Sequence, residues 1–203
     1  EIMILQGKSG SGKSLFGRYL EESLWNKYFN NNESIIKTIP IFISFPKYYN
    51  SQNEQEFISQ ALQMKNINKQ MIDIIRENIS FVFILDGFDE ISPQSKKSAE
   101  ILISKQDRGQ LWITTRDYIE ERLEKNALSS YKLISYSKDD QTKFAIDFWT
   151  KETKNDRKLI EVCSKLLVDR LDLILSKSAV NFIGLPLIFC VFVEFFKTKL
   201  SDK

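Results

Sequence analysis

Short apolar runs separated by helical patterns dominate the chain up to about residue 136. The runs are Ile2–Leu5, Ile39–Phe45, Phe81–Leu85 and Leu111–Thr115, each of a length typical of a buried strand. Between them, apolar residues recur at spacings of three and four, as in amphipathic helices. Strands that alternate with helices form parallel sheets joined by right-handed crossovers. The pattern therefore predicts an α/β fold.

The segments between these runs predict helices and one further strand. The apolar positions of the first helix are Leu15, Phe16, Tyr19, Leu20, Leu24 and Tyr28. The remaining predicted elements are a loop at 30–34, one or two helices within 54–78 separated near Asn66-Ile67-Asn68, helices over about 94–105 and 117–125, and a short strand over 132–135. Pro40 has no backbone N–H, which favours an edge position for its strand.

After Tyr136 the pattern is helical only, so we predict an α/β domain over 1–136 and a small helical subdomain over 137–203. Ser137 and Asp140 have the spacing of a capping box. The apolar positions of the first two helices are Phe144, Ile146, Phe148 and Trp149, then Leu159, Cys163, Leu166 and Leu167, followed by Arg170. We expect these faces to form a core.

The stretch from Ala179 to Phe196 is apolar enough to raise the question of a membrane span. Asn181, Gly184, Pro186 and Glu194 interrupt it, which leaves less than the roughly 20 apolar residues that a span needs. Proline suits the first turn of a helix. We therefore predict a buried helix that begins near Pro186.

The first candidate site follows the first strand, where Gly7 to Ser14 fit the phosphate-loop pattern G-x-x-x-x-G-K-[ST]. The alternative is a plain Gly/Ser-rich turn between a strand and a helix. In a phosphate loop, glycines let backbone N–H groups surround a phosphate at a helix N-terminus. Lys13 would neutralise the β- and γ-phosphates, and the Ser14 hydroxyl would bind Mg²⁺. The predicted nucleotide-binding residues are Gly7, Lys8, Ser9, Gly10, Ser11, Gly12, Lys13, Ser14 and Leu15.

A second candidate site follows the apolar run Phe81–Leu85, which ends in Asp86-Gly87-Phe88-Asp89-Glu90. A buried strand thus delivers three carboxylates at its C-terminal end, where open α/β sheets bind ligands. Asp86 is placed to hold Mg²⁺ together with Ser14, the Walker B role. An acidic cluster after a strand can also be a solvated turn or a helix cap, but the phosphate loop favours the metal site.

The ending D-G-h-D-E, where h is apolar, resembles the NACHT family of signal-transduction ATPases. Three further segments resemble motifs of that family: Leu111 to Arg116, Tyr136 to Asp140, and Gly184-Leu185-Pro186, the G-x-P motif. The resemblance implies a P-loop NTPase fold with a five-stranded, mostly parallel sheet of order 5-1-4-3-2. It also implies that the turn at Pro186 packs on the base or ribose of ADP, although Pro186 could merely start a helix.

Within this resemblance, the catalytic candidates are Asp89, Glu90 and Arg116. Because Asp86 holds the metal, Asp89 or Glu90 should orient the attacking water; the family places an acid at Asp89, but the sequence leaves both open. Arg116 follows a strand expected beside Asp86, and its planar guanidinium can bridge phosphate oxygens. We therefore expect it to sense the γ-phosphate. The alternative is an exposed arginine that opens a helix.

Two functions remain from the sequence. The first is a signalling switch that holds ADP in a closed state and ATP in an open, self-associating one, with slow Mg²⁺-dependent ATP hydrolysis. The second is a turnover ATPase that does mechanical or remodelling work. A GTPase is disfavoured because Asn68-Lys69-Gln70-Met71 lacks the aspartate of the guanine-recognition loop. A small-molecule kinase would not be expected to carry the D-G-x-D-E ending.

Composition agrees with this interpretation. Lys and Arg number 29 against 27 Asp and Glu, a formal net charge of +2, so no strong field favours nucleic acid or anionic lipid. The chain has no histidine, which excludes histidine bases and ligands. Cys163 and Cys190 form no CxxC pair, which favours a reducing, cytoplasmic location. Because the chain starts inside its first strand, we expect a piece of a longer protein whose other parts carry sensor and effector modules.

Overall fold

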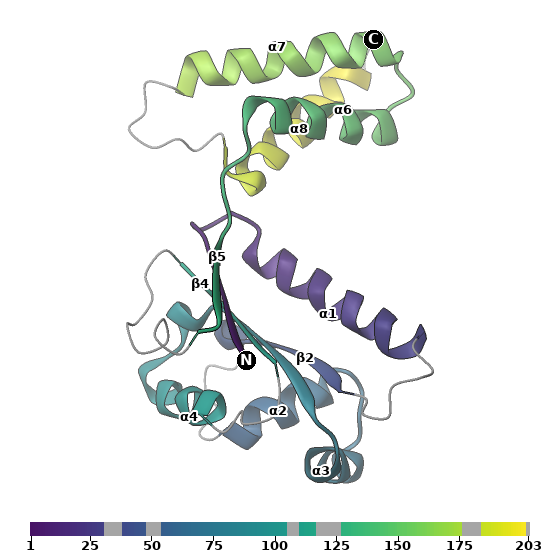
Figure 1. The fold of residues 1–203 in the computed structure, drawn as a ribbon. Helices are drawn as coiled ribbons and strands as arrows, with labels where there is room; N and C mark the ends of the chain where they lie inside the picture. The colour runs from purple at the N-terminus through teal and green to yellow at the C-terminus, as the bar shows by residue number, and fades with distance from the viewer. Residues whose placement is uncertain (31–37, 48–53, 105–109, 117–126, 176–183, 202–203) are drawn as a thin grey trace. The chain divides into compact units, whose positions relative to one another are not determined.

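The computed structural model describes residues 1–30, 38–47, 54–104, 110–116, 127–175 and 184–201 (Figure 1). The chain forms two compact units. The first comprises Glu1–Lys8 and Lys13–Leu133, and the second comprises Ser9–Gly12 and Ile134–Lys203. The tip of the phosphate loop therefore belongs to the same compact unit as the C-terminal helices.

The first unit is built on a five-stranded parallel sheet of order β2-β3-β4-β1-β5. Its strands are β1 (Ile2–Gln6), β2 (Ile39–Ser44), β3 (Phe81–Asp86), β4 (Leu111–Thr115) and β5 (Ser129–Lys132). Its helices are α1 (Lys13–Asn30), η1 (Phe45–Lys47), α2 (Glu54–Gln63), α3 (Lys69–Asn78), η2 (Phe88–Glu90) and α4 (Pro93–Ser104). Read from the other edge, this is the expected order 5-1-4-3-2, so the predicted fold is confirmed.

The two faces of the sheet are covered by different helices (Figure 1). Alternate side chains of a strand point to opposite faces, and in β3 Phe83 and Leu85 join the core formed with α2, α3 and α4. Ile84 points the other way, where it lies 3.3 Å from the position of a Cβ on Gly17 of α1. Asp86 shares the face of Ile84. The alternation therefore aims Asp86 at the side of α1.

Strand β2 lies at one edge of the sheet, as Pro40 predicts. The N–H of Ile39 donates to the carbonyl of Ser80, on the side of β3, at 2.9 Å. The N–H of Phe42 points to the open side, where the Glu21 carboxylate accepts it at 2.9 Å. Pro40 has the same parity as Phe42, so its missing donor falls on the open side as well. A side chain from α1 thus satisfies part of the exposed edge.

The last strand lies earlier than the sequence predicts. We expected 132–135, whereas β5 spans Ser129–Lys132 and Ile134 is 82% exposed. Two bonds to β1 bracket the pairing: Leu128 N–H donates to the Ile2 carbonyl at 2.7 Å, and Leu133 N–H to the Gln6 carbonyl at 2.8 Å. The prediction was wrong because this edge strand is polar and exposed, so its position follows backbone pairing and not an apolar run.

The segment 54–78 forms two helices, which decides between the one or two that the sequence leaves open. Asn66, three residues after the end of α2, has φ 63°, a left-handed conformation that does not continue a helix. The Asn68 side chain caps α3 by accepting the Met71 N–H at 2.9 Å. The predicted helix over 94–105 corresponds to α4. The helix expected over 117–125 and most of the loop expected at 30–34 lie outside the described residues.

The second unit contains the helices α6 (Lys138–Glu152), α7 (Arg157–Leu175) and α8 (Pro186–Ser201). The predicted capping box is present: Ser137 Oγ accepts the Asp140 N–H at 3.1 Å, and Asp140 Oδ2 accepts the Ser137 N–H at 2.9 Å. Hydrogen bonding from Ser137 also lowers the pKa of Asp140. The buried Trp149 donates its indole N–H to the Val193 carbonyl at 2.9 Å, which ties α6 to α8.

The core face of α7 matches the expected one only at Leu167 and at the partly buried Cys163. Leu167 is buried, but Leu159 and Leu166 are 42% and 55% exposed. The buried positions of α7 are Ile160, Ser164, Leu167, Val168 and Leu171. The helix carries apolar residues on more than one face, and periodicity by itself does not say which of these faces packs inward.

Helix α8 begins at Pro186, as predicted, but it is amphipathic and not wholly buried. Phe189 and Val193 are fully buried, whereas Leu187, Val191 and Phe195 are each more than 60% exposed. Within the part of the chain that the structure describes, no helix has both the length and the apolarity to cross a membrane.

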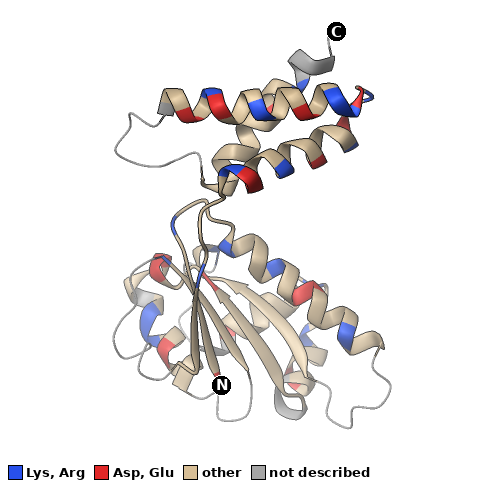
Figure 2. Cartoon of the chain, turned by 45° about the horizontal axis from the view of Figure 1, so that its top comes forward, with Lys and Arg blue, Asp and Glu red and all other residues tan. Residues whose placement is uncertain are grey.

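Basic and acidic side chains are interspersed along the helices (Figure 2). In α1, Arg18 is followed by Glu21 and Glu22 and then by Lys27. The same mixing occurs along α7. Along these helices, residues of both charge signs therefore follow one another.

The turn before α8 requires a glycine because the chain passes it closely. The Tyr136 N–H donates to the Gly184 carbonyl at 2.7 Å. A Cβ on Gly184 would lie 2.7 Å from the Ser135 Cβ and 3.2 Å from the Tyr136 carbonyl oxygen. Neither atom is the end of a flexible side chain. Gly184 therefore lets the segment that enters α6 meet the turn that starts α8.

We predict that Gly184→Ala lowers the free energy of unfolding by about 1–3 kcal/mol, the usual cost of overpacking. Adding Ser135→Gly to this variant removes the nearest clashing atom and should recover part of the loss. Urea unfolding of the wild type, Gly184→Ala and the double variant gives the comparison. A Gly184→Ala chain as stable as the wild type would show that the close approach is not a constraint.

Candidate functional site

The phosphate loop leaves the sheet at the end of β1. The Gly7 N–H donates to the Thr115 carbonyl at 3.2 Å, which continues the pairing of β1 with β4 by one residue. Gly10 and Gly12 have φ values of 78° and 95°, a left-handed backbone that disfavours side chains. No atom lies within 4 Å of a Cβ placed on Gly12, so the backbone conformation and not crowding calls for glycine there.

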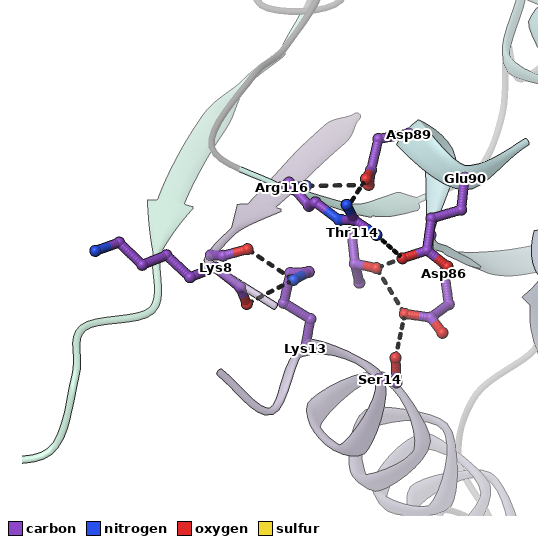
Figure 3. Close-up of polar contacts among 10 residues, drawn as sticks. Lys8, Lys13, Ser14, Asp86, Asp89, Glu90, Thr114 and Arg116 are labelled. Atoms are coloured by element: carbon purple, nitrogen blue, oxygen red, sulfur yellow. Dashed lines mark hydrogen bonds and ion pairs between the residues drawn. The ribbon is translucent and has the colours of Figure 1, made fainter. Parts of the chain in front are cut away.

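Lys13 turns back onto its own loop. Its ammonium donates to the carbonyls of Gly7 at 2.7 Å and Lys8 at 3.0 Å, while the Lys8 side chain extends away (Figure 3). Burial lowers the pKa of Lys13, and Arg116 lowers it further. Nearby carboxylates oppose this shift: Asp89, Asp86 and Glu90. A partly desolvated ammonium can bind an anion strongly when it exchanges these carbonyls for phosphate oxygens.

Ser11 offers a second sign that the loop fits a phosphate. Its side chain is buried, and its hydroxyl has no hydrogen-bond partner among the described residues. A buried hydroxyl without a partner costs free energy unless a ligand or water supplies one. The other predicted residues Ser9 and Leu15 are exposed, and Leu15 is 73% exposed.

Asp86 accepts two hydroxyl groups at one oxygen. Ser14 Oγ donates to Asp86 Oδ1 at 3.0 Å, and Thr114 Oγ1 donates to the same atom at 2.6 Å (Figure 3). Thr114 also accepts the Gly87 N–H at 3.0 Å. Asp86 and Thr114 are 5% and 1% exposed. The structure therefore brings the two predicted metal ligands, Ser14 and Asp86, together.

Thr114 was not among the predicted site residues. The available signal was the strand order, because β4 beside β3 in the register Leu85 to Ile113 places Thr114 level with Asp86. Its hydroxyl donates to the same carboxylate oxygen as Ser14 and so helps to orient that carboxylate. The sequence motif points to Arg116, two residues later. Thr114 is a polar residue inside an apolar strand, and no motif marks it.

The oxygens of Ser14 and Asp86 fit Mg²⁺, which prefers hard oxygen ligands and usually takes only one or two from the protein. The remaining ligands then come from substrate phosphate and water. No group of three or more His, Cys, Asp or Glu side chains that could hold a metal occurs among the described residues. The site thus suits a metal bound jointly with a phosphate.

A left-handed turn at Gly87 places the next two acids. Gly87 has φ 75° and ψ 45°, and a Cβ there would lie 3.2 Å from the Pro46 Cδ. Phe88 is buried against Phe45, with ring centroids 5.9 Å apart. The backbone conformation therefore favours glycine after Asp86, and the close approach of Pro46 adds to that preference. With Phe88 anchored inside, η2 presents Asp89 and Glu90 outside.

Arg116 contacts both of these acids. Its Nε lies 3.0 Å from Asp89 Oδ2, and its Nη2 donates to Glu90 Oε1 at 2.6 Å. Its backbone N–H also donates to Asp89 Oδ1 at 3.1 Å (Figure 3). The structure thus assembles the three predicted catalytic residues into one ion-paired cluster at the ends of β3 and β4.

Pro186 lies in the second unit, at the first residue of α8. In the same unit the Leu187 N–H donates to the carbonyl of Gly10 at 3.2 Å. The G-x-P turn is therefore adjacent in the structure to a residue of the phosphate loop.

The sheet order, the glycine loop and the cluster around Asp86 together define a nucleotide-binding module of the P-loop NTPase class. The family model of the NACHT domain matches residues 1–152. The chain therefore belongs to the NACHT domain family. A search of curated proteins finds no match.

Solved structures support the fold. The ORC2 protein of Aeropyrum pernix in its ADP form has a TM-score of 0.62 at 12% identity, with 100% of this chain and 59% of that one covered. PCH-2 of C. elegans has a TM-score of 0.50 at 15% identity, with coverages of 98% and 62%. This chain thus spans about three fifths of the length of each structure. At such identities the likeness concerns the fold alone.

We predict that Thr114→Val raises about tenfold the Mg²⁺ concentration at which Mg²⁺ half-maximally enhances nucleotide binding. Residues that orient a metal ligand typically contribute this much to metal affinity. Valine keeps the shape but removes the hydroxyl. Thr114→Ser keeps the hydroxyl and should remain close to the wild type. Titration of ADP affinity against Mg²⁺ gives the comparison. Equal Mg²⁺ dependence in all three proteins would contradict the orienting role.

Proposed function

We propose that this domain is an ATP/ADP-dependent switch that controls self-association in signalling and hydrolyses ATP slowly with Mg²⁺. The proposal rests on the hydrogen bond between Ser14 and Asp86. It lies beside Lys13, at the ends of β1 and β3. It combines a partly buried cation, a hydroxyl and a carboxylate, which are the groups that phosphates and magnesium need.

Each group has a proposed role. The loop from Gly7 to Gly12 and Lys13 bind the phosphates, and Ser14 and Asp86 hold Mg²⁺. When bound, the ion offsets phosphate charge. Either Asp89 or Glu90 orients the attacking water. Arg116 distinguishes the triphosphate from the diphosphate because its guanidinium can bridge phosphate oxygens.

The G-x-P turn supports a switch over a turnover enzyme. The hydrogen bond from Leu187 to Gly10 links the start of α8 to the phosphate loop. In our proposal Pro186 packs on bound ADP and holds the helical subdomain in the ADP-bound arrangement. ATP releases this contact, and a second copy of the same domain is the partner that then binds. The working location is the cytoplasm.

We predict that Lys13→Ala weakens binding of both ATP and ADP by one to two decades, because a charge-assisted contact to phosphate contributes about 1.5–3 kcal/mol. Calorimetry with Mg·ADP and Mg·ATP measures the loss. Lys27→Ala, at an exposed position near the other end of α1, is the matched control for removing a lysine. Unchanged affinity in Lys13→Ala would dismiss this site.

We predict that Pro186→Ala releases ADP faster and increases self-association with little loss of thermal stability. ADP that co-purifies with the wild type, followed by stopped-flow release and light scattering, provides the measurement. Pro93→Ala is the control, since Pro93 also occupies the first position of a helix. Loss of stability with unchanged ADP release would leave Pro186 only a helix-start role. A wild type that retains no nucleotide and turns over rapidly would favour the remodelling ATPase.

A further inference from the structure

We propose that Asp89 and Glu90 are positioning residues for Arg116 and that they set the preference of the site for ADP over ATP. The two carboxylates occupy the guanidinium in the way that phosphate oxygens would, so a γ-phosphate must compete with them, whereas ADP need not. The inference rests on the proposed function, because it assigns the nucleotide selectivity of that same site.

The contacts restrain Arg116 from two sides. Its Nε contacts Asp89 at 3.0 Å and its Nη2 contacts Glu90 at 2.6 Å, so two different nitrogens of the fork are engaged. The backbone N–H of Arg116 contacts the other oxygen of Asp89 at 3.1 Å. A guanidinium binds paired oxygens best in such a fork arrangement. Two carboxylates on successive residues therefore imitate the oxygens of one phosphate.

The carboxylates are themselves held in place. Gly87 turns the chain in a left-handed conformation, and Glu90 N–H donates to the Gly87 carbonyl at 2.9 Å. Phe88 is buried beneath them. The Gly87 N–H donates to Thr114, two residues before Arg116. The acids and the arginine thus extend from the adjacent, hydrogen-bonded ends of β3 and β4.

The ion pairs with Asp89 and Glu90 are strong enough to hold Arg116 on these carboxylates and weak enough for a γ-phosphate to replace them. The hydrogen bond with Glu90 raises the pKa of Arg116, and the charges of Asp89 and Glu90 raise it further. The side chains of Arg116, Asp89 and Glu90 are 54%, 23% and 44% exposed, so water and salt screen the pairs. A γ-phosphate with more charge than either carboxylate can displace them, which frees the acids for the water-orienting role.

The test is a double-mutant cycle that reports the ratio of triphosphate to diphosphate affinity. The proteins are the wild type, Glu90→Gln, Arg116→Ala and the combination, and the probes are Mg·ADP and Mg·ADPNP. Releasing an exposed pair should raise the ADPNP-to-ADP affinity ratio of Glu90→Gln by about fivefold. In the Arg116→Ala background, the same substitution should change the ratio by less than about twofold, because no guanidinium remains to be released.

Asp89→Asn, with and without Arg116→Ala, repeats the cycle for the second carboxylate. Thermal unfolding of every variant checks the fold. An equal change of the ratio in both backgrounds would reveal only a general effect of removing negative charge and would overturn the proposal. No change of the affinity ratio in either background would also overturn the proposal. The proposed function would still stand in that case if Lys13→Ala weakened nucleotide binding. Absence of nucleotide binding by the wild type would instead overturn the proposed function and the inference with it.

Discussion

The buried carboxylate of Asp86 is the group on which the arrangement of the site depends. An acidic side chain at the inner end of a fully buried strand is costly unless donors compensate it, and the hydroxyls of Ser14 and Thr114 both do so. These hydroxyls belong to α1 and β4. One carboxylate therefore links the helix after the phosphate loop to β4, the strand that precedes Arg116.

A second constraint follows directly from the first along the chain. The left-handed Gly87 and the buried Phe88 convert the end of β3 into a fixed platform for Asp89 and Glu90. Arg116, which follows β4, pairs with both carboxylates and offsets part of their charge. In the proposed switch, an added phosphate would compete with these two carboxylates for Arg116.

The second unit is built on close contacts of a different kind. Gly184 lets the segment before α6 pass within hydrogen-bond distance of the turn before α8, and Pro186 then starts that helix. The Leu187 N–H reaches Gly10 of the phosphate loop. A backbone hydrogen bond thus connects the start of α8 to a loop residue that is proposed to bind phosphate.

The sequence by itself determined the parallel sheet and the phosphate loop, and it singled out Ser14 and Asp86, because short apolar runs and glycine-rich motifs are local signals. The family resemblance supplied the strand order. Three features were decided only by the tertiary structure: the register of β5, the core face of α7, and the contacts of Thr114 and Arg116. Strand register, helix rotation and ion pairing depend on partners that are distant in the sequence. No local pattern specifies them, because their free energy arises only when the elements pack together.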